Sequence, residues 1–305
     1  PFGDISQVPT FLVAQMASQK VKVVLTGDGG DETFSGYKHY PEGLVQWNRL
    51  SKLPHGMRTF AAEGLAILGN SSWRLLKPTG VARREKLPGW RKAAGKLQRR
   101  TRSWRSATAQ EVLANHFART PRPESLVIDA PSGVSNMNDS DVWAQGVDPL
   151  PAMLHFDFVG YMVGDILVKV DRATMAVGLE ARCPILDTRV TEFAWTLPQE
   201  FMIDAGGGKR ILREVLQRYV PREFTDRPKR GFGVPIDDWL KGPLRGWAED
   251  LISLPRLREY GYLEPAAVRR LWEQHLCGWQ NHSNILWSVI MFQAWLDELK
   301  RDHSH

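Results

Sequence analysis

The sequence predicts a mixed α/β domain that becomes mainly helical toward its C-terminus. Near the N-terminus, a short β-branched run at residues 21–25 ends in a glycine-rich acidic loop, which is typical of a buried strand in a short parallel sheet. In residues 151–305, apolar side chains recur at helical spacing. The chain has 305 residues and is 43% hydrophobic, which is enough to form a core of ordinary size.

We treat the chain as a single domain, 1–305, with three regions. Residues 1–40 predict helix, strand, loop and helix, with Pro9 in a first helical turn that tolerates proline. Residues 41–150 contain many prolines and predict a variable insertion of short helices and loops. Residues 151–305 predict a helical region that completes the site.

Three apolar patterns define the expected helices of the third region. They cover residues 162–170, residues 211–219 in a helix that ends near Pro221, and residues 285–295. Tryptophans also recur every seven or eight residues, which predicts one helical face that packs inward. These tryptophans are Trp272, Trp279, Trp287 and Trp295.

The net charge of +6 is concentrated in a basic run at residues 82–105. One interpretation is a nucleic-acid-binding surface, because Trp90 and Trp104 are interleaved with the basic side chains and could stack on bases. The other interpretation is a solvated helical face. We favour the solvated face, and disfavour nucleic acid as a partner, because no recognised nucleic-acid motif accompanies the run.

Several classes of protein are disfavoured. No stretch approaches the ~18 consecutive apolar residues that span a bilayer, and no leader peptide is recognisable. Cys183 and Cys277 form no metal-ligand pair, and such sparse cysteine suits a reducing compartment such as the cytoplasm. Because the chain begins with Pro1 and its first pattern is typical of the middle of a domain, we expect a longer parent polypeptide.

The segment at residues 26–32 is the most informative part of the chain. Its glycines let the backbone approach a ligand closely. Its carboxylates repel one another, so we expect a cation between them, and Mg²⁺ is the natural candidate because it takes one or two carboxylates and phosphate oxygens. The candidate residues are Thr26, Gly27, Asp28, Gly29, Gly30, Asp31 and Glu32.

The position of this acidic loop also fits a ligand site. A loop that leaves the carboxyl end of a buried strand is where open α/β sheets bind ligands. Asp31 and Glu32 would lie in the first turn of the next helix, where the helix dipole favours anions. The alternative is that these two residues only start a helix.

Residues 23–37 resemble the SGDGGDE-x-F-x-GY signature of asparagine synthetases and their relatives, which include β-lactam-forming synthetases and lasso-peptide cyclases. The resemblance implies that Asp31 helps to hold Mg²⁺ and pyrophosphate. It implies that Asp28 lines the site where an acyl-adenylate reacts. The residues it implies as ligands of ATP or pyrophosphate are Thr26, Gly27, Gly29, Gly30 and Glu32.

Residues 165–187 resemble a second block of this family, D-x-x-x-x-x-D-R-x-[ST]-M…LE-x-R-x-P-x-LD. Asp165, Lys169 and Arg172 share one helix face, which in an isolated helix would be a solvated salt-bridge face. The Arg-x-Pro-x-Leu-Asp continuation favours a fixed tertiary corner instead. The residues expected to support the site are Asp171, Arg172, Arg182 and Asp187.

Residues 208–235 resemble the third block, K-x-x-LR…P…R-x-K-x-GF-x-x-P. Lys209 opens its helix, where the dipole disfavours a cation, so we expect a compensating anion beside it. The resemblance implies that Lys229 stabilises the charge that develops during attack on the adenylate, and removing such a donor typically costs about 10²-fold in rate. The alternative for either lysine is an ordinary surface charge.

The resemblance implies an adenine nucleotide α-hydrolase-like synthetase domain. The family's SGG-x-DS phosphate loop and its N-terminal glutaminase domain do not occur in this sequence, so we expect the first strands of the domain to be missing and the chain alone to be inactive. An uncovered sheet edge would then favour a homodimer or poor solubility.

The implied activity is that of an ATP-dependent ligase that forms an amide bond through an acyl-adenylate. The resemblance favours asparagine synthesis from aspartate, ATP and glutamine-derived ammonia. The same chemistry could instead act on another carboxylate, such as a polysaccharide or a peptide. A third interpretation is an interaction module without activity.

Overall fold

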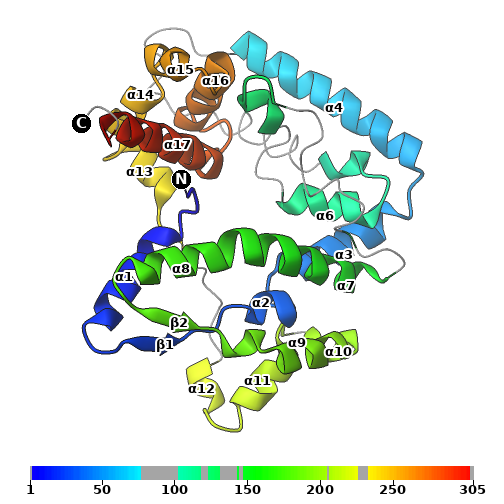
Figure 1. Ribbon diagram of the computed structural model, residues 1–305. Helices are drawn as coiled ribbons and strands as arrows, with labels where there is room; N and C mark the ends of the chain where they lie inside the picture. The colour runs from blue at the N-terminus through cyan, green and yellow to red at the C-terminus, as the bar shows by residue number, and fades with distance from the viewer. Residues whose placement is uncertain are drawn as a thin grey trace.

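The computed structural model describes residues 2–76, 102–117, 123–130, 143, 147–204, 206–225 and 233–302. Figure 1 shows a sheet lobe, built around two strands, and a C-terminal lobe of helices. The N-terminal segment lies beside helix α17 of the C-terminal lobe (Figure 1), so the two lobes share it.

The sheet lobe contains a two-stranded parallel sheet. Strand β1 (Val23–Leu25) pairs with β2 (Glu180–Arg182), and Val24 lies opposite Ala181. The short parallel sheet that the sequence predicts is therefore present. The other elements of this lobe are α1 (Gln7–Ser18), α2 (Gly30–Thr33), α7 (Pro149–Phe156), η5 (Asp157–Ile166), α8 (Leu167–Met175), η6 (Pro184–Leu186), α9 (Thr188–Trp195), α10 (Gln199–Met202), α11 (Arg210–Leu216) and α12 (Arg222–Thr225).

One long helical stretch, α7–η5–α8, crosses the sheet lobe above α2 (Figure 1). Its middle part, η5, is a ten-residue π-helix. Helices of this kind are rare and are often found at functional sites. The helix expected at residues 162–170 is confirmed, although it spans the end of the π-helix and the start of α8.

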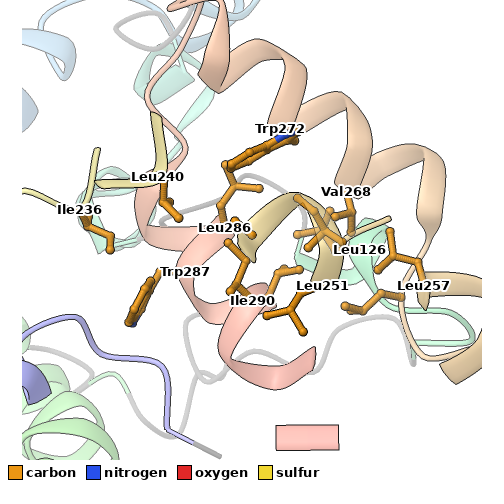
Figure 2. Packing of buried hydrophobic residues seen from close by; sticks show 14 residues of the cluster. Leu126, Ile236, Leu240, Leu251, Leu257, Val268, Trp272, Leu286, Trp287 and Ile290 are labelled. Carbon is orange, nitrogen blue, oxygen red and sulfur yellow. The ribbon is translucent and has the colours of Figure 1, made fainter. Parts of the chain in front are cut away.

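The C-terminal lobe buries one continuous apolar core, which Figure 2 shows from close by. The helix expected at residues 285–295 is confirmed within α17. The four tryptophans are at least partly buried, but the expectation of a single face is wrong, because a turn at Gly278 separates α16 from α17. The helices of this lobe are α13 (Ile236–Lys241), α14 (Arg245–Leu251), α15 (Leu254–Tyr260), α16 (Pro265–Leu276) and α17 (Ser283–Asp302).

The insertion at residues 41–150 is only partly described. Its helix α4 is 22 residues long, so the expectation of short helices is wrong here. Pro54 lies directly before the first residue of this helix and therefore does not interrupt it. The basic run lies outside the described residues except for its last four. The described elements are α3 (His39–Leu50), α4 (His55–Leu76), η2 (Arg102–Arg105), α6 (Ala109–Phe117) and η3 (Pro123–Leu126).

The expectation that β1 is buried is wrong. Val23 is 44% exposed and Leu25 is 73% exposed. Within the described residues, β1 has a partner strand along one edge only, so the uncovered sheet edge that the sequence predicts is present. No helix in this described part of the chain has the length and apolar character needed to cross a bilayer.

Candidate active site

The acidic loop connects β1 to α2. Gly29 has a φ of 90°, and a Cβ at this position would lie 2.3 Å from Leu186 Cδ2. Glycine is therefore required here by both the backbone and the available space. Asp31 and Glu32 lie in the first turn of α2, as predicted, although a four-residue helix has only a weak dipole.

An ion pair joins this loop to the start of α11. Lys209 Nζ lies 3.1 Å from Asp31 Oδ1, and their side chains are 30% and 23% exposed. Asp31 is therefore the anion that the position of Lys209 predicted. Both side chains are partly exposed, so solvent and a charged ligand can reach the pair.

Two glycines allow the ion pair to form. The Lys209 N–H donates to the Phe34 carbonyl oxygen at 2.9 Å, so two loops touch through their backbones. A Cβ at Gly208 would lie 1.7 Å from the Ser35 carbonyl oxygen. A Cβ at Gly36 would lie 2.0 Å from Asp31 Oδ1 and 2.3 Å from Lys209 Cε. Sequence reasoning missed this role, although both glycines lie within or beside the quoted motifs.

Two non-glycine residues at this contact have left-handed backbones. Ser35 and Lys209 each have a φ of 58°. Such residues cost on the order of 1 kcal/mol or more and concentrate at functional sites. Ser35 is fully buried, so the surrounding packing holds the conformation.

Glu32 and Thr26 use their side chains within the protein. The Tyr37 hydroxyl donates to Glu32 Oε1 at 2.5 Å, and Thr26 Oγ1 lies 3.2 Å from Cys183 Sγ. Burial raises the pKa of Glu32, and the charge of Asp31 adds to the rise while the Tyr37 hydrogen bond opposes it. Because both side chains already have partners within the protein, their contact with phosphate stays a prediction.

A buried carboxylate lies in the π-helix η5, which contacts α2. Asp157, in the π-helix, is fully buried and accepts a hydrogen bond from the Tyr40 hydroxyl at 2.5 Å. His39 Nε2 lies 3.2 Å from the same carboxylate oxygen, and its ring stacks on Tyr37 at 5.2 Å. Burial raises the pKa of Tyr40 well above its ordinary value. Sequence reasoning missed this cluster, whose one signal was an aspartate inside an apolar helix.

The second motif block contacts the N-terminal segment. Lys169 is 8% exposed, and its Nζ lies 3.6 Å from Asp4 Oδ2 and 3.0 Å from Ser6 Oγ. The solvated-face interpretation is therefore wrong for Lys169. The Arg172 guanidinium lies 6.0 Å from the centre of the Phe2 ring.

Within the described residues, no side-chain hydrogen bond or ion pair joins the other expected supporting residues to the acidic loop. Arg182 pairs with Glu180, although its backbone carbonyl accepts from the Thr26 N–H at 2.8 Å. Asp187 accepts from the Arg189 N–H at the start of α9, and the bonds to Arg189 lower the pKa of Asp187. Asp171 is exposed on α8. Arg182 and Asp187 lie at the corner between β2 and α9, and the supporting role of all three residues stays a prediction.

Asp28 lies half-buried in the loop between β1 and α2, and Gly29 and Gly30 separate it from Asp31. Within the described residues there is no group of three or more potential metal ligands from His, Cys, Asp and Glu. Mg²⁺ needs only one or two carboxylates when phosphate oxygens complete its shell, so this donor set fits it. Lys229 lies outside the described residues.

Comparison with known proteins places these observations in one family. The profile of the family described as asparagine synthase matches residues 1–297. The chain is 35% identical over 311 residues to a putative glutamine-hydrolysing asparagine synthetase of Mycobacterium tuberculosis (strain ATCC 25618 / H37Rv), in an alignment that covers 97% of this chain and 42% of the relative.

Two further relatives agree over most of the chain. Asparagine synthetase 1 of Bacillus subtilis (strain 168) is 28% identical over 297 residues, covering 97% of this chain and 43% of that protein. Amidase chyE of Penicillium rubens is 24% identical over 294 residues, covering 90% and 41%. The chain thus spans less than half the length of these curated relatives. By its profile match and its sequence identity, the chain belongs to the asparagine synthase family.

Proposed function

We propose that the protein containing this chain uses ATP to form an amide bond through an acyl-adenylate. The observation that carries the proposal is the Asp31–Lys209 ion pair, with its atoms 3.1 Å apart at the carboxyl end of β1. Gly36 leaves space for the pair that a side chain would fill, and Gly208 lets its loop approach the Ser35 backbone. A loop held this closely is suited to a charged ligand that contacts backbone and side chains together.

Each residue of the site has a separate role in this proposal. Asp31 would help to hold Mg²⁺, which when bound neutralises phosphate charge, and Asp28 would line the site where the acyl-adenylate reacts. The loop backbone at Gly29 and Gly30 would approach the pyrophosphate group. Lys209, already beside Asp31, would stabilise the departing phosphate oxygens, and Lys229 would stabilise the charge that develops as the nucleophile attacks.

The substrates follow from the names of the relatives. We propose aspartate as the carboxylate and ammonia, released from glutamine by a further domain of the longer polypeptide, as the nucleophile. A different carboxylate, such as a polysaccharide or a peptide, is the alternative within the same chemistry. Pocket shape decides between these substrates, so the assay must compare them directly.

The test is pyrophosphate release from Mg-ATP by the protein expressed from its complete gene. Aspartate is compared with a panel of other carboxylates, with ammonia as nucleophile. We expect aspartate-dependent release that falls by about 10²-fold or more in Lys209→Ala and Lys229→Ala. Lys52→Ala, at an exposed turn, is the matched control and should keep full activity.

Each outcome has a definite meaning. Release that depends on another carboxylate keeps the chemistry and changes the substrate. Absence of release with every carboxylate tested would contradict the proposed function. Equal rates in Lys52→Ala and Lys209→Ala would contradict the role of the ion pair.

A further inference from the structure

Lys209, which pairs with Asp31, has an unusual backbone conformation. Its φ of 58° lies in the left-handed region, where a non-glycine residue costs free energy and persists only when its surroundings hold it. Its N–H donates to the Phe34 carbonyl oxygen, and its own carbonyl oxygen accepts from the Arg213 N–H at 2.9 Å, where α11 begins. The chain must therefore enter α11 along a fixed path.

A reversal of the chain just before Lys209 defines this path. Asp204 and Gly207 form an antiparallel bridge, in which each N–H donates to the carbonyl oxygen of the other residue at 3.0 Å. Gly207 has a φ of 112°, which residues with a side chain rarely adopt. Because the reversal comes directly before Lys209, its shape determines where the Lys209 backbone lies.

One ion pair joins this reversal to α11. Arg213 Nη2 donates to Asp204 Oδ1 at 2.5 Å and to the Gly207 carbonyl oxygen at 3.4 Å. The same Asp204 oxygen accepts from the Gly206 N–H at 2.7 Å. A Cβ at Gly206 would lie 2.7 Å from Arg213 Nη1, so the guanidinium lies against this glycine. The Arg213 side chain therefore connects α11 to both residues of the bridge.

We propose that Asp204 and Arg213 are positioning residues, which hold the Lys209 backbone so that its ammonium group reaches Asp31. This inference rests on the proposed function, in which Lys209 stabilises the departing phosphate oxygens. The Asp204 and Arg213 side chains are each 35% exposed, so solvent screens their charges and the pair contributes little to global stability. Its loss should therefore change the placement of Lys209 much more than the folding of the protein.

Hydrogen exchange followed by mass spectrometry tests the positioning without any reaction. The protein is expressed from its complete gene, and the peptide that contains the Lys209 N–H is followed. Arg213→Met removes the guanidinium, and we expect this peptide to exchange at least about tenfold faster, because the reversal can open locally. Arg218→Met, at an exposed arginine just after α11, is the matched control and should keep the wild-type rate. Unchanged exchange in Arg213→Met would overturn the proposal.

A double-mutant cycle separates an effect through Lys209 from a general structural effect. It measures pyrophosphate release with the carboxylate that the wild-type protein uses. Arg213→Met should lower release by about tenfold in the wild-type background and by no more than about twofold in the Lys209→Ala background, where no ammonium group is left to position. The same fold loss in both backgrounds would overturn the proposal.

A second variant keeps the test decisive if Arg213→Met does not fold, which circular dichroism melting shows. Asp204→Asn keeps an acceptor for the Gly206 N–H but removes the charge, so exchange and release should each change by about threefold in the same directions. No change in either would overturn the proposal. Absence of release by the wild-type protein would contradict the proposed function alone, because hydrogen exchange still decides whether the pair holds the Lys209 backbone.

Discussion

The C-terminal lobe and the sheet lobe differ in what they bury. In the C-terminal lobe, Trp272 and Leu286 are fully buried within one continuous apolar cluster (Figure 2). In the sheet lobe, Glu32 is 2% exposed and Asp157 is fully buried, whereas Leu25 faces solvent. The first lobe is therefore assembled mainly by the hydrophobic effect, whereas the second combines an apolar cluster around α7 with buried polar contacts beside the acidic loop.

This difference separates stability from function. Burial of a charge costs free energy unless the charge is paired and hydrogen-bonded, so a polar interior contributes little to stability. It does fix the orientation of each group, which a ligand site requires. We therefore expect mutations in the C-terminal lobe to act on stability and mutations around the acidic loop to act mainly on activity.

The largest effect is expected from Trp272→Ala. Removing a fully buried tryptophan should lower the free energy of unfolding by about 3 to 5 kcal/mol. Leu25→Ala, at the exposed strand of the sheet lobe, should change it by no more than about 0.5 kcal/mol. Urea denaturation of both variants measures the difference. Equal losses would show that β1 is covered and would remove the contrast between the lobes.

The next effect concerns His275, which is fully buried in the C-terminal lobe. Burial and the nearby Lys241 lower the pKa of His275 from 6.5 to about 4, although the charge of Asp237 opposes the shift. Its Nδ1 accepts from the His282 N–H at 3.3 Å, and its Nε2 has no hydrogen-bond partner within the described residues. The folded protein therefore keeps this imidazole neutral.

Stability should consequently depend on pH in the acidic range. As pH falls from about 6.5 to about 4, the unfolded chain takes up a proton at His275 and the folded chain does not, so unfolding becomes easier by up to about 3 kcal/mol. His275→Asn keeps an acceptor for His282 and should reduce this dependence. The measurement is urea denaturation between these pH values. As a control, His55→Gln replaces an exposed histidine on α4 and should keep the wild-type dependence of stability on pH. The same dependence in His275→Asn would refute the assignment to His275.

A third effect is expected at Gly36, where the change should act on activity. Alanine would place its Cβ 2.0 Å from Asp31 Oδ1 and 2.3 Å from Lys209 Cε, so the ion pair must separate. We expect pyrophosphate release to fall by about 10²-fold, comparable to the loss of a charge-stabilising donor. Because both side chains of the pair are partly exposed to solvent, its loss alone should cost no more than about 1 kcal/mol of stability.

The matched control for Gly36→Ala is Gly64→Ala. Gly64 lies on the exposed side of α4, and a Cβ there would meet nothing within 4 Å. Alanine favours a helix over glycine by up to about 1 kcal/mol, so this variant should be slightly more stable and fully active. Full activity in Gly36→Ala would show that the Asp31–Lys209 contact is dispensable.

The sequence predicted the local features of the site correctly. The helix start at Asp31 and the anion beside Lys209 follow from dipole arguments that need only neighbouring residues. The helical character of residues 151–305 follows in the same way from the helical spacing of apolar side chains. Eleven of the fourteen buried residues of the C-terminal core are likewise apolar positions of α13 to α17, and the other three are Leu126, Ile252 and Leu263.

The sequence could not predict features that depend on distant packing. Tyr40 and Asp157 meet although the long insertion separates them in sequence. The exposure of β1 depends on what covers it, which a β-branched run does not specify. The role of Gly36 depends on a close approach by another loop, and a glycine in a motif has several possible causes.

The smallest effect is expected from Glu32→Gln, which tests whether the buried carboxyl of Glu32 lowers stability or serves as a ligand of the site. Burial raises the pKa of Glu32, so the folded protein favours the neutral carboxyl more than the unfolded chain does. The stability of the protein should therefore fall as pH rises through the ordinary range of a glutamate. Glutamine can still accept the Tyr37 hydroxyl and has no charge to bury.

We therefore expect Glu32→Gln to raise the melting temperature at about pH 8 and to have little effect at about pH 4, where the carboxyl is protonated in both states. Glu63→Gln, which is exposed, should show no such dependence on pH. A lower melting temperature at about pH 8 would mean that the ionised carboxylate holds a cation in the folded protein. Glu32 would then be a ligand of the site, as the motif implies, and the polar interior of the sheet lobe would contribute to stability as well as to function.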